Sequence, residues 1–198
     1  MSKNKMKSSI KFSISIAVIT FVLAAIFSIV SSSLLNKVTW YFGFVIVFVI
    51  VLIGILFDIL GIAPAAASEE PFHAMAAKKV KGAKESLFVV RNADRFASFC
   101  NDVIGDISGI VSGTALTVVL VQIGNILKAA EGSTFEITLS VVMTSILAAL
   151  TVGGKALGKT FALKSSTQVV LIAGKVIHFL EHTFKMQITQ KSKSKKRR

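Results

Sequence analysis

Four long apolar stretches constrain this chain more than any other feature of its sequence. They cover residues 12–34, 40–62, 96–122 and 137–152. A helix of about 20 residues crosses the roughly 30 Å of hydrocarbon in a bilayer, because each residue adds about 1.5 Å. In lipid, a helix also satisfies its own backbone hydrogen bonds. The sequence therefore predicts an all-α integral membrane protein with four transmembrane helices.

The composition agrees with a membrane protein. Apolar residues make up 53% of the 198 residues, charged residues make up 17%, and the mean hydropathy is +0.73. These values lie outside the range of soluble globular proteins. Four spans leave no room for a separate soluble domain of ordinary size. Cys100 is the only cysteine, so no intramolecular disulfide can form.

The positive charges gather in three segments. The N-terminal segment, the segment between the second and third spans, and the region from Lys155 onward hold 21 of the 23 lysines and arginines. Lys37 and Lys128 are the two others, one in each remaining loop. The positive-inside rule therefore predicts a multi-pass protein of the cell membrane, with both termini in the cytoplasm facing anionic lipid. A basic tail alone is a weak signal for nucleic acid, which we do not expect as a partner.

Two polar segments are expected to fold beside the membrane. Residues 69–95 are polar and basic, and we expect them to be helical and to lie at the cytoplasmic surface. Residues 162–185 carry apolar positions on one helical face and polar positions, including two histidines, on the other. This pattern predicts a C-terminal amphipathic interfacial helix. Pro64 and the small residues around it predict a kink or an unwound end of the second span.

We divide the chain into three parts from these patterns. Residues 1–39 form a basic tail and an additional transmembrane helix, which we expect to stay as an uncleaved anchor because its apolar core is long for a signal peptide. Residues 40–185 form the main transmembrane domain. Residues 186–198 form a basic disordered cytoplasmic tail.

Carboxylates inside the spans are the strongest functional signal. Asp102 and Asp106 lie one helical turn apart in the third span, and Asp58 lies at a comparable depth in the second. Insertion scales put the cost of an ionised side chain in a span at about 3 kcal/mol, so such a group needs a partner, a pathway or a bound cation. Lys155 follows the fourth span and could reach these carboxylates. The pattern therefore indicates either a cation site or a lysine-paired polar cluster.

Three further motifs have simpler explanations. Gly105, Gly109 and Gly113 repeat at a four-residue spacing that favours close helix packing, within the chain or in a homodimer. Residues 153–160 match the letters of a phosphate-binding loop, but a membrane span precedes them, so we expect no nucleotide. The two histidines of the amphipathic segment have no third metal ligand in the sequence pattern. No nucleophile and base are paired, so we do not expect an enzyme.

The order of five short motifs resembles that of a known family. They are a break reading Ala67-Ser68-Glu69, a basic hairpin at 74–85, an Asp94-Arg95-Phe96 start, a small-residue core at 110–113, and Gly154 to Thr160 after the last span. Over about residues 45–185, this order resembles the transmembrane domain of the cyclin M (CNNM)/CorC family of magnesium transporters. The family's regulatory domains are not among these residues.

The resemblance implies a cytoplasmic juxtamembrane helical hairpin at 74–85. It also implies a cation site lined by Ser68 and Asn101. With the carboxylates, the expected metal-binding residues are Asp106, Asp102, Asn101, Asp58 and Ser68. Oxygen ligands suit a hard ion, so magnesium is the expected bound or transported ion.

Lys155 departs from the family pattern, in which a cation-holding glutamate occupies its position. An ammonium there opposes a divalent ion or replaces it. We therefore expect a divalent-cation (magnesium) transporter or a transporter-like protein. The alternative is a non-transporting membrane scaffold or partner subunit whose cation site is closed by Lys155.

The predicted topology determines which positions a reagent outside the cell can reach. Cysteines engineered near Lys37 and Lys128 should react with a membrane-impermeant maleimide in intact cells. A cysteine near Lys193 should react only after the cells are opened, because the positive-inside rule places it in the cytoplasm. Labelling near Lys193 in intact cells would contradict this topology.

Overall fold

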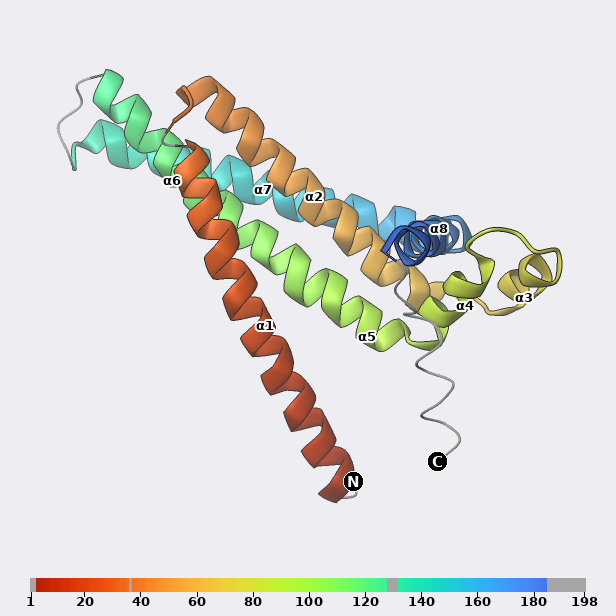
Figure 1. Cartoon of the computed structure of the whole chain (residues 1–198). Coiled ribbons are helices and arrows are strands. Elements are labelled where there is room, and N and C mark those ends of the chain that lie inside the picture. The colour runs from red at the N-terminus through yellow and green to blue at the C-terminus, as the bar shows by residue number, and fades with distance from the viewer. Residues whose placement is uncertain (1–2, 36, 128–131, 185–198) are drawn as a thin grey trace. The chain divides into compact units, whose positions relative to one another are not determined.

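The computed structural model is all-α over the residues that it describes, which are 3–35, 37–127 and 132–184 (Figure 1). The expected basic tail at 186–198 lies outside these residues. The elements in order are α1 (Lys3–Leu35), α2 (Trp40–Ala66), α3 (Glu70–Ala77), α4 (Ala83–Arg91), α5 (Ala93–Ala97), a π-helix (Ser98–Gly105), α6 (Asp106–Ile126), α7 (Thr134–Lys164) and α8 (Ser166–Phe184).

The four expected spans are confirmed as four helices that are long and apolar enough to cross a membrane. These helices are Ile10–Leu35, Trp40–Ala66, Ala93–Ile126 and Thr134–Lys164. The third of these is helical throughout, but its winding changes along its length. It consists of α5, then the π-helix, then α6.

The sequence predicts that the fourth span ends at Gly153–Gly154, but the helix does not end there. Helix α7 continues to Lys164. A glycine costs a helix only about 1 kcal/mol relative to alanine, and the residues that follow are mostly good helix formers. The second span also stays helical through Pro64 and ends two residues later, at Ala66. Pro64 therefore lies in the last turn of α2.

The chain forms two compact units. The first comprises Met1–Phe57 and Asn101–Ala156, and it holds most of the four spans. The second comprises Asp58–Cys100 and Leu157–Arg198, and it holds the remaining span ends together with α3, α4 and α8.

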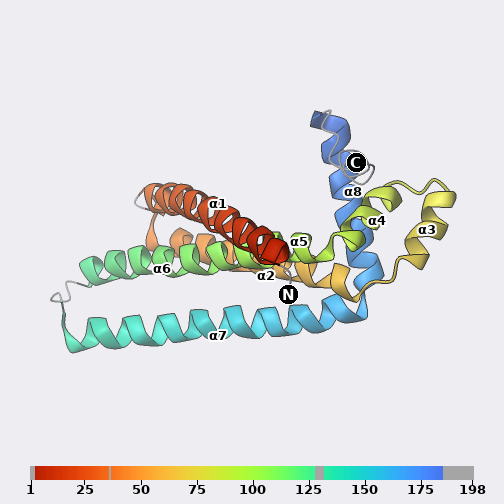
Figure 2. The same ribbon diagram turned by 90° about the horizontal axis from the view of Figure 1, so that it is seen from below.

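Helix α6 is the centre of the first unit. Figure 2 shows α1 lying against it, and Leu35 of α1, Val47 of α2 and Val119 of α6 share one apolar cluster. Glycine permits a close approach in one place, because a Cβ on Gly54 of α2 would lie only 2.9 Å from the Cβ of Ser108. Close backbone approach of this kind is how helices associate where lipid is as apolar as the protein.

The glycine stripe of α6 packs only in part. The Gly105 carbonyl oxygen would lie 3.6 Å from a Cβ on Gly54, whereas nothing lies within 4 Å of a Cβ on Gly109 or Gly113. Packing of Gly109 and Gly113 within the chain is therefore not seen in the described residues. Packing between two copies stays a prediction.

The second unit contains the expected helical hairpin, made by α3 and α4. Its turn carries the two positive φ angles of this segment, +54° at Lys79 and +84° at Gly82. The span-end core, as we call the apolar cluster beneath the hairpin, joins the ends of α2 and α7 to α4 and α8. Its buried members are Ala63, Phe72, Val89, Ala162, Val169 and Val170.

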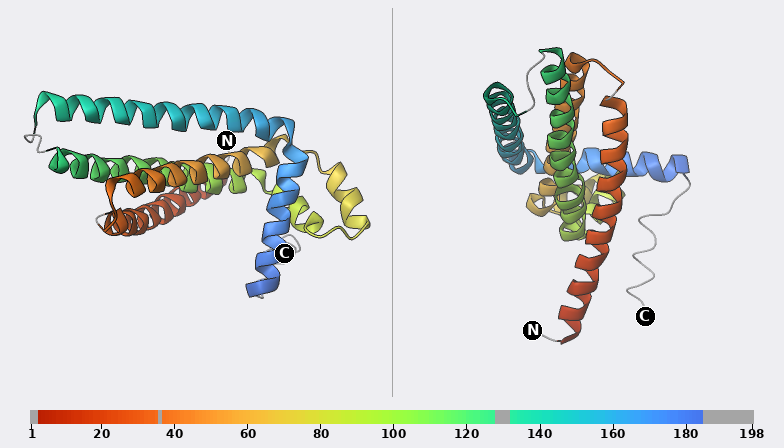
Figure 3. Two further views of the ribbon diagram at one scale, coloured as in Figure 1. Left: turned by 90° about the horizontal axis from the view of Figure 1, so that it is seen from above. Right: turned by 90° about the vertical axis from the view of Figure 1, so that its left-hand side faces the viewer.

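Helix α8 crosses α4 at a point of very close approach (Figure 3, left, α8 in blue). Gly174 has the Ser86 hydroxyl and the Gly82 carbonyl where its Cβ would stand. The fully buried Ser86 hydroxyl lies 2.8 Å from the Gly82 oxygen and 3.1 Å from the Val170 oxygen. Both partners are carbonyl oxygens, so the single hydroxyl proton of Ser86 is shared between an acceptor at the start of α4 and an acceptor in α8.

Replacing Gly174 by alanine should therefore destabilise the protein by about 1–3 kcal/mol, the usual cost of overpacking a filled site. Gly153→Ala is the matched control, because Gly153 also lies inside a helix but nothing lies within 4 Å of its Cβ position. Thermal unfolding of the purified protein in detergent measures both. Equal midpoints for the two variants would show that the crossing is not tightly packed.

Candidate functional site

The third span changes its helical type where the predicted site residues lie. Residues Ser98–Gly105 form a π-helix, and α6 begins directly after it at Asp106. π-helical turns are rare and are frequently found at functional sites. The sequence reasoning predicted a regular helix here, because residue composition carries no signal for this winding. Asn101 and Asp102 lie in this segment.

Asn101 carries an unsatisfied polar atom. Its side-chain Oδ1 is buried and has no hydrogen-bond partner. A buried acceptor without a partner costs about 1–3 kcal/mol, so native structures rarely keep one without a reason. Asp102, the next residue, is exposed. The Asn101 oxygen is therefore the group in this segment that most needs a ligand or a water.

Asp106 is paired with Lys155 inside the first unit. The Lys155 Nζ lies 3.7 Å from the Asp106 Oδ1, and the side chains are 25% and 66% exposed, respectively. Gly154, beside Lys155, has the Ile55 side chain of α2 at its Cβ position, so α7 approaches α2 closely at this level. This approach sets the position of Lys155 along α7. Lys155 is the more buried of the two partners.

The two charges lie at the same level of their helices. Asp106 is 20 residues from the end of α6 at Ile126, and Lys155 is 21 residues from the start of α7 at Thr134. Both separations correspond to about 30 Å, which is the thickness of the hydrocarbon. The pair therefore lies toward the end of the spans that is far from the loop joining α6 to α7.

Asp58 and Ser68 belong to the second unit, and the other three predicted ligands belong to the first. Asp58 is half-buried and makes an interaction of its own. The Ser68 hydroxyl accepts a hydrogen bond from the Glu70 backbone N–H at 3.4 Å. Within the described residues, no group of three or more His, Cys, Asp or Glu side chains is placed to hold a metal ion. The five-residue metal site stays a prediction.

A polar cluster that the sequence reasoning missed joins α3 to α4. Arg91 donates a hydrogen bond through Nε to the Glu69 carboxylate at 2.9 Å. The His73 Nε2 lies 3.2 Å from Arg91 and 3.3 Å from Glu69. One ring nitrogen cannot donate to the carboxylate and accept from the guanidinium at once, so His73 serves one neighbour at a time. The hydrogen bond from Arg91 lowers the pKa of the Glu69 carboxyl.

A second missed pair joins α4 to α8. Glu85 is buried, and its Oε1 lies 3.0 Å from the Nδ1 of His178. The helical spacing of His178 indicated only a polar face, because the sequence does not show which helix will pack against that face. The contact shows that α4, rather than solvent alone, faces the polar side of α8.

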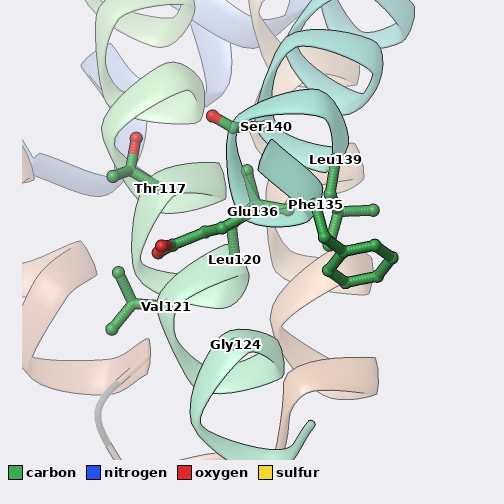
Figure 4. A pocket seen from close by; sticks show the side chains of 8 residues that line it. All are labelled: Thr117, Leu120, Val121, Gly124, Phe135, Glu136, Leu139 and Ser140. Atoms are coloured by element: carbon green, nitrogen blue, oxygen red, sulfur yellow. The ribbon is translucent and has the colours of Figure 1, made fainter. Parts of the chain in front are cut away.

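One small pocket lies at the other end of the first unit (Figure 4). It encloses about 80 Å³ between α6 and α7. Glu136 is its one ionisable side chain, and this carboxylate accepts a hydrogen bond from the Gly132 backbone N–H at 2.8 Å. The lining residues are Thr117, Leu120, Val121, Gly124, Phe135, Glu136, Leu139 and Ser140. With no second titratable group, the pocket offers no acid–base pair.

Comparisons with protein-family models, with curated proteins and with solved structures give no match. They identify no family for the chain. Its four long apolar helices make it an integral, multi-pass membrane protein.

Proposed function

We propose that this membrane protein is a non-transporting scaffold or partner subunit, in which the Lys155 ammonium takes the place of a cation. The observation that supports the proposal is the 3.7 Å distance between the Lys155 Nζ and the Asp106 Oδ1. A carboxylate inside a span is retained when it has a partner. Lys155 is such a partner, and it cannot leave because it is covalently part of α7.

The charge of Lys155 also acts against a divalent ion. An ion approaching Asp106 meets the ammonium beside it, and like charges at close range repel. In the CNNM/CorC-like reading of the sequence, a glutamate would stand at this position and add a ligand. Replacing that carboxylate by an ammonium changes the local charge by two units. The same bundle would then be held together without an ion.

A magnesium transporter is the second candidate, and the buried Asn101 oxygen favours it. The resemblance implies that Asn101 and Ser68 line a cation site, to which Asp58, Asp102 and Asp106 would add carboxylates. In this candidate, Lys155 moves away when the ion binds. For both functions we propose the cell membrane, with the basic segments and both termini in the cytoplasm, because 21 of 23 positive charges lie in those segments.

Magnesium-dependent thermal stability distinguishes the two functions. If Lys155 replaces the ion, Mg²⁺ should not raise the unfolding temperature of the wild type. Lys155→Glu should acquire stabilisation by Mg²⁺, and adding Asp106→Asn should remove it. Lys159→Glu is the matched control, because it makes the same charge change one turn further along α7. Stabilisation of the wild type that Asp106→Asn abolishes would overturn the proposal and support the transporter.

A double-mutant cycle checks the pair without any metal. Lys155→Met should destabilise the protein by leaving the Asp106 carboxylate without its ammonium. Asp106→Asn in the same chain should recover part of the loss, with a coupling of about 0.5–3 kcal/mol. Strictly additive effects would show that the two side chains do not stabilise each other.

A further inference from the structure

Helix α8 has an apolar stripe that the chain itself does not cover. Ile172, Val176 and Phe179 recur at the spacing of one helical face and are 57%, 53% and 66% exposed. A different face of the same helix carries Val170, which is buried in the span-end core, and Ala173, which is also buried. Helix α8 is therefore apolar on two sides, and only one of them is covered within the second unit.

Exposed lysines lie close to the middle of α8. Lys78, Lys79 and Lys81 lie in the α3–α4 turn, and Lys84 lies in the first turn of α4; all four are exposed. Gly82, between them, has the backbone of Gly174 and Lys175 within 3 Å of its Cβ position, so the turn contacts the middle of α8. Lys175 is also exposed and directly precedes Val176. We call these five lysines and the stripe the α8 platform.

The α8 platform is tied to the ends of membrane spans by short connections. A single residue, Ser165, separates α7 from α8, and three residues separate α2 from α3. The span-end core then packs Ala63 of α2 and Ala162 of α7 against Val89 and Val170. The short connections and this packing hold the α8 platform beside the ends of α2 and α7.

We propose that the α8 platform binds the surface of an anionic lipid membrane. The stripe of Ile172, Val176 and Phe179 enters the boundary between headgroups and acyl chains, and the lysines contact lipid phosphates. Apolar residues beside lysines on one helix are the pattern of interfacial helices, and anionic lipid attracts each lysine near the surface. A soluble acidic protein would match the lysines, but it would not account for a stripe held at the span ends. This proposal does not rest on the Asp106–Lys155 pair.

Site-directed fluorescence in liposomes tests the proposal on the full chain. A Cys100→Ser background removes the one native thiol, and Val176→Cys then carries a polarity-sensitive label. Liposomes contain phosphatidylcholine alone or phosphatidylcholine mixed with phosphatidylglycerol, each with brominated acyl chains as quencher. We expect a blue-shifted, quenched label at 176, with stronger quenching when phosphatidylglycerol is present. A label at His182→Cys, on the polar face, should be quenched less.

Charge variants show whether the lysines of the turn cause the lipid response. Changing Lys78, Lys79, Lys81 and Lys84 together to glutamine should abolish the extra quenching by phosphatidylglycerol, whereas the matched change to arginine should retain it. A chain ending at Phe184 should also retain it, because the α8 platform excludes the later residues. Unchanged elution and thermal midpoint confirm that each variant is folded.

Two results would overturn the proposal. A label at 176 that emits as in water and is unquenched in both kinds of liposome would show a surface facing the aqueous phase, as a soluble partner would require. Loss of the phosphatidylglycerol response on removal of residues 185–198 would assign the lipid binding to the basic tail.

Discussion

The cost of an unpaired charge in or beside hydrocarbon is the constraint on which this structure depends. Asp106 lies in a span and has the Lys155 ammonium 3.7 Å away, and the buried Glu85 has His178 at 3.0 Å. Each pair joins two helices that are distant in sequence, α6 to α7 and α4 to α8. Glu85 is buried, so removing His178 would leave its carboxylate without this hydrogen-bond partner, which is costly inside a protein. These polar contacts add to the apolar packing that holds the helices together.

Small residues complement this pairing, because lipid gives helices little hydrophobic reason to associate. Gly54 lets α6 approach α2 closely, and Gly174 lets α4 approach α8 closely. At the second crossing, the Ser86 hydroxyl adds a hydrogen bond to the Val170 carbonyl oxygen, which would be lost if the helices separated. The span-end core then fixes the hairpin and α8 to the ends of α2 and α7. This is how the hairpin and α8 obtain defined positions against the ends of α2 and α7.

Length and periodicity predicted the four spans and the amphipathic α8 correctly, because these are local properties, whereas the hairpin was expected from the order of the motifs. They failed at Gly153–Gly154, where helix continuation outweighs glycine's low propensity, and at Ser98–Gly105, where no residue pattern signals π-winding. The Arg91–Glu69 contact was missed because it depends on how the hairpin folds back. The approach of Lys155 to a carboxylate was predicted from charge, while the choice of Asp106 came only from the structure.

Magnesium uptake by the purified wild-type protein in proteoliposomes tests most directly whether Lys155 has replaced the ion. The liposomes enclose a fluorescent magnesium indicator, and protein-free liposomes set the background leak. The account predicts uptake equal to this background at every magnesium concentration, because the ammonium beside Asp106 excludes the ion. Saturable uptake above background that is lost in Asp106→Asn would contradict the account and establish the protein as a transporter.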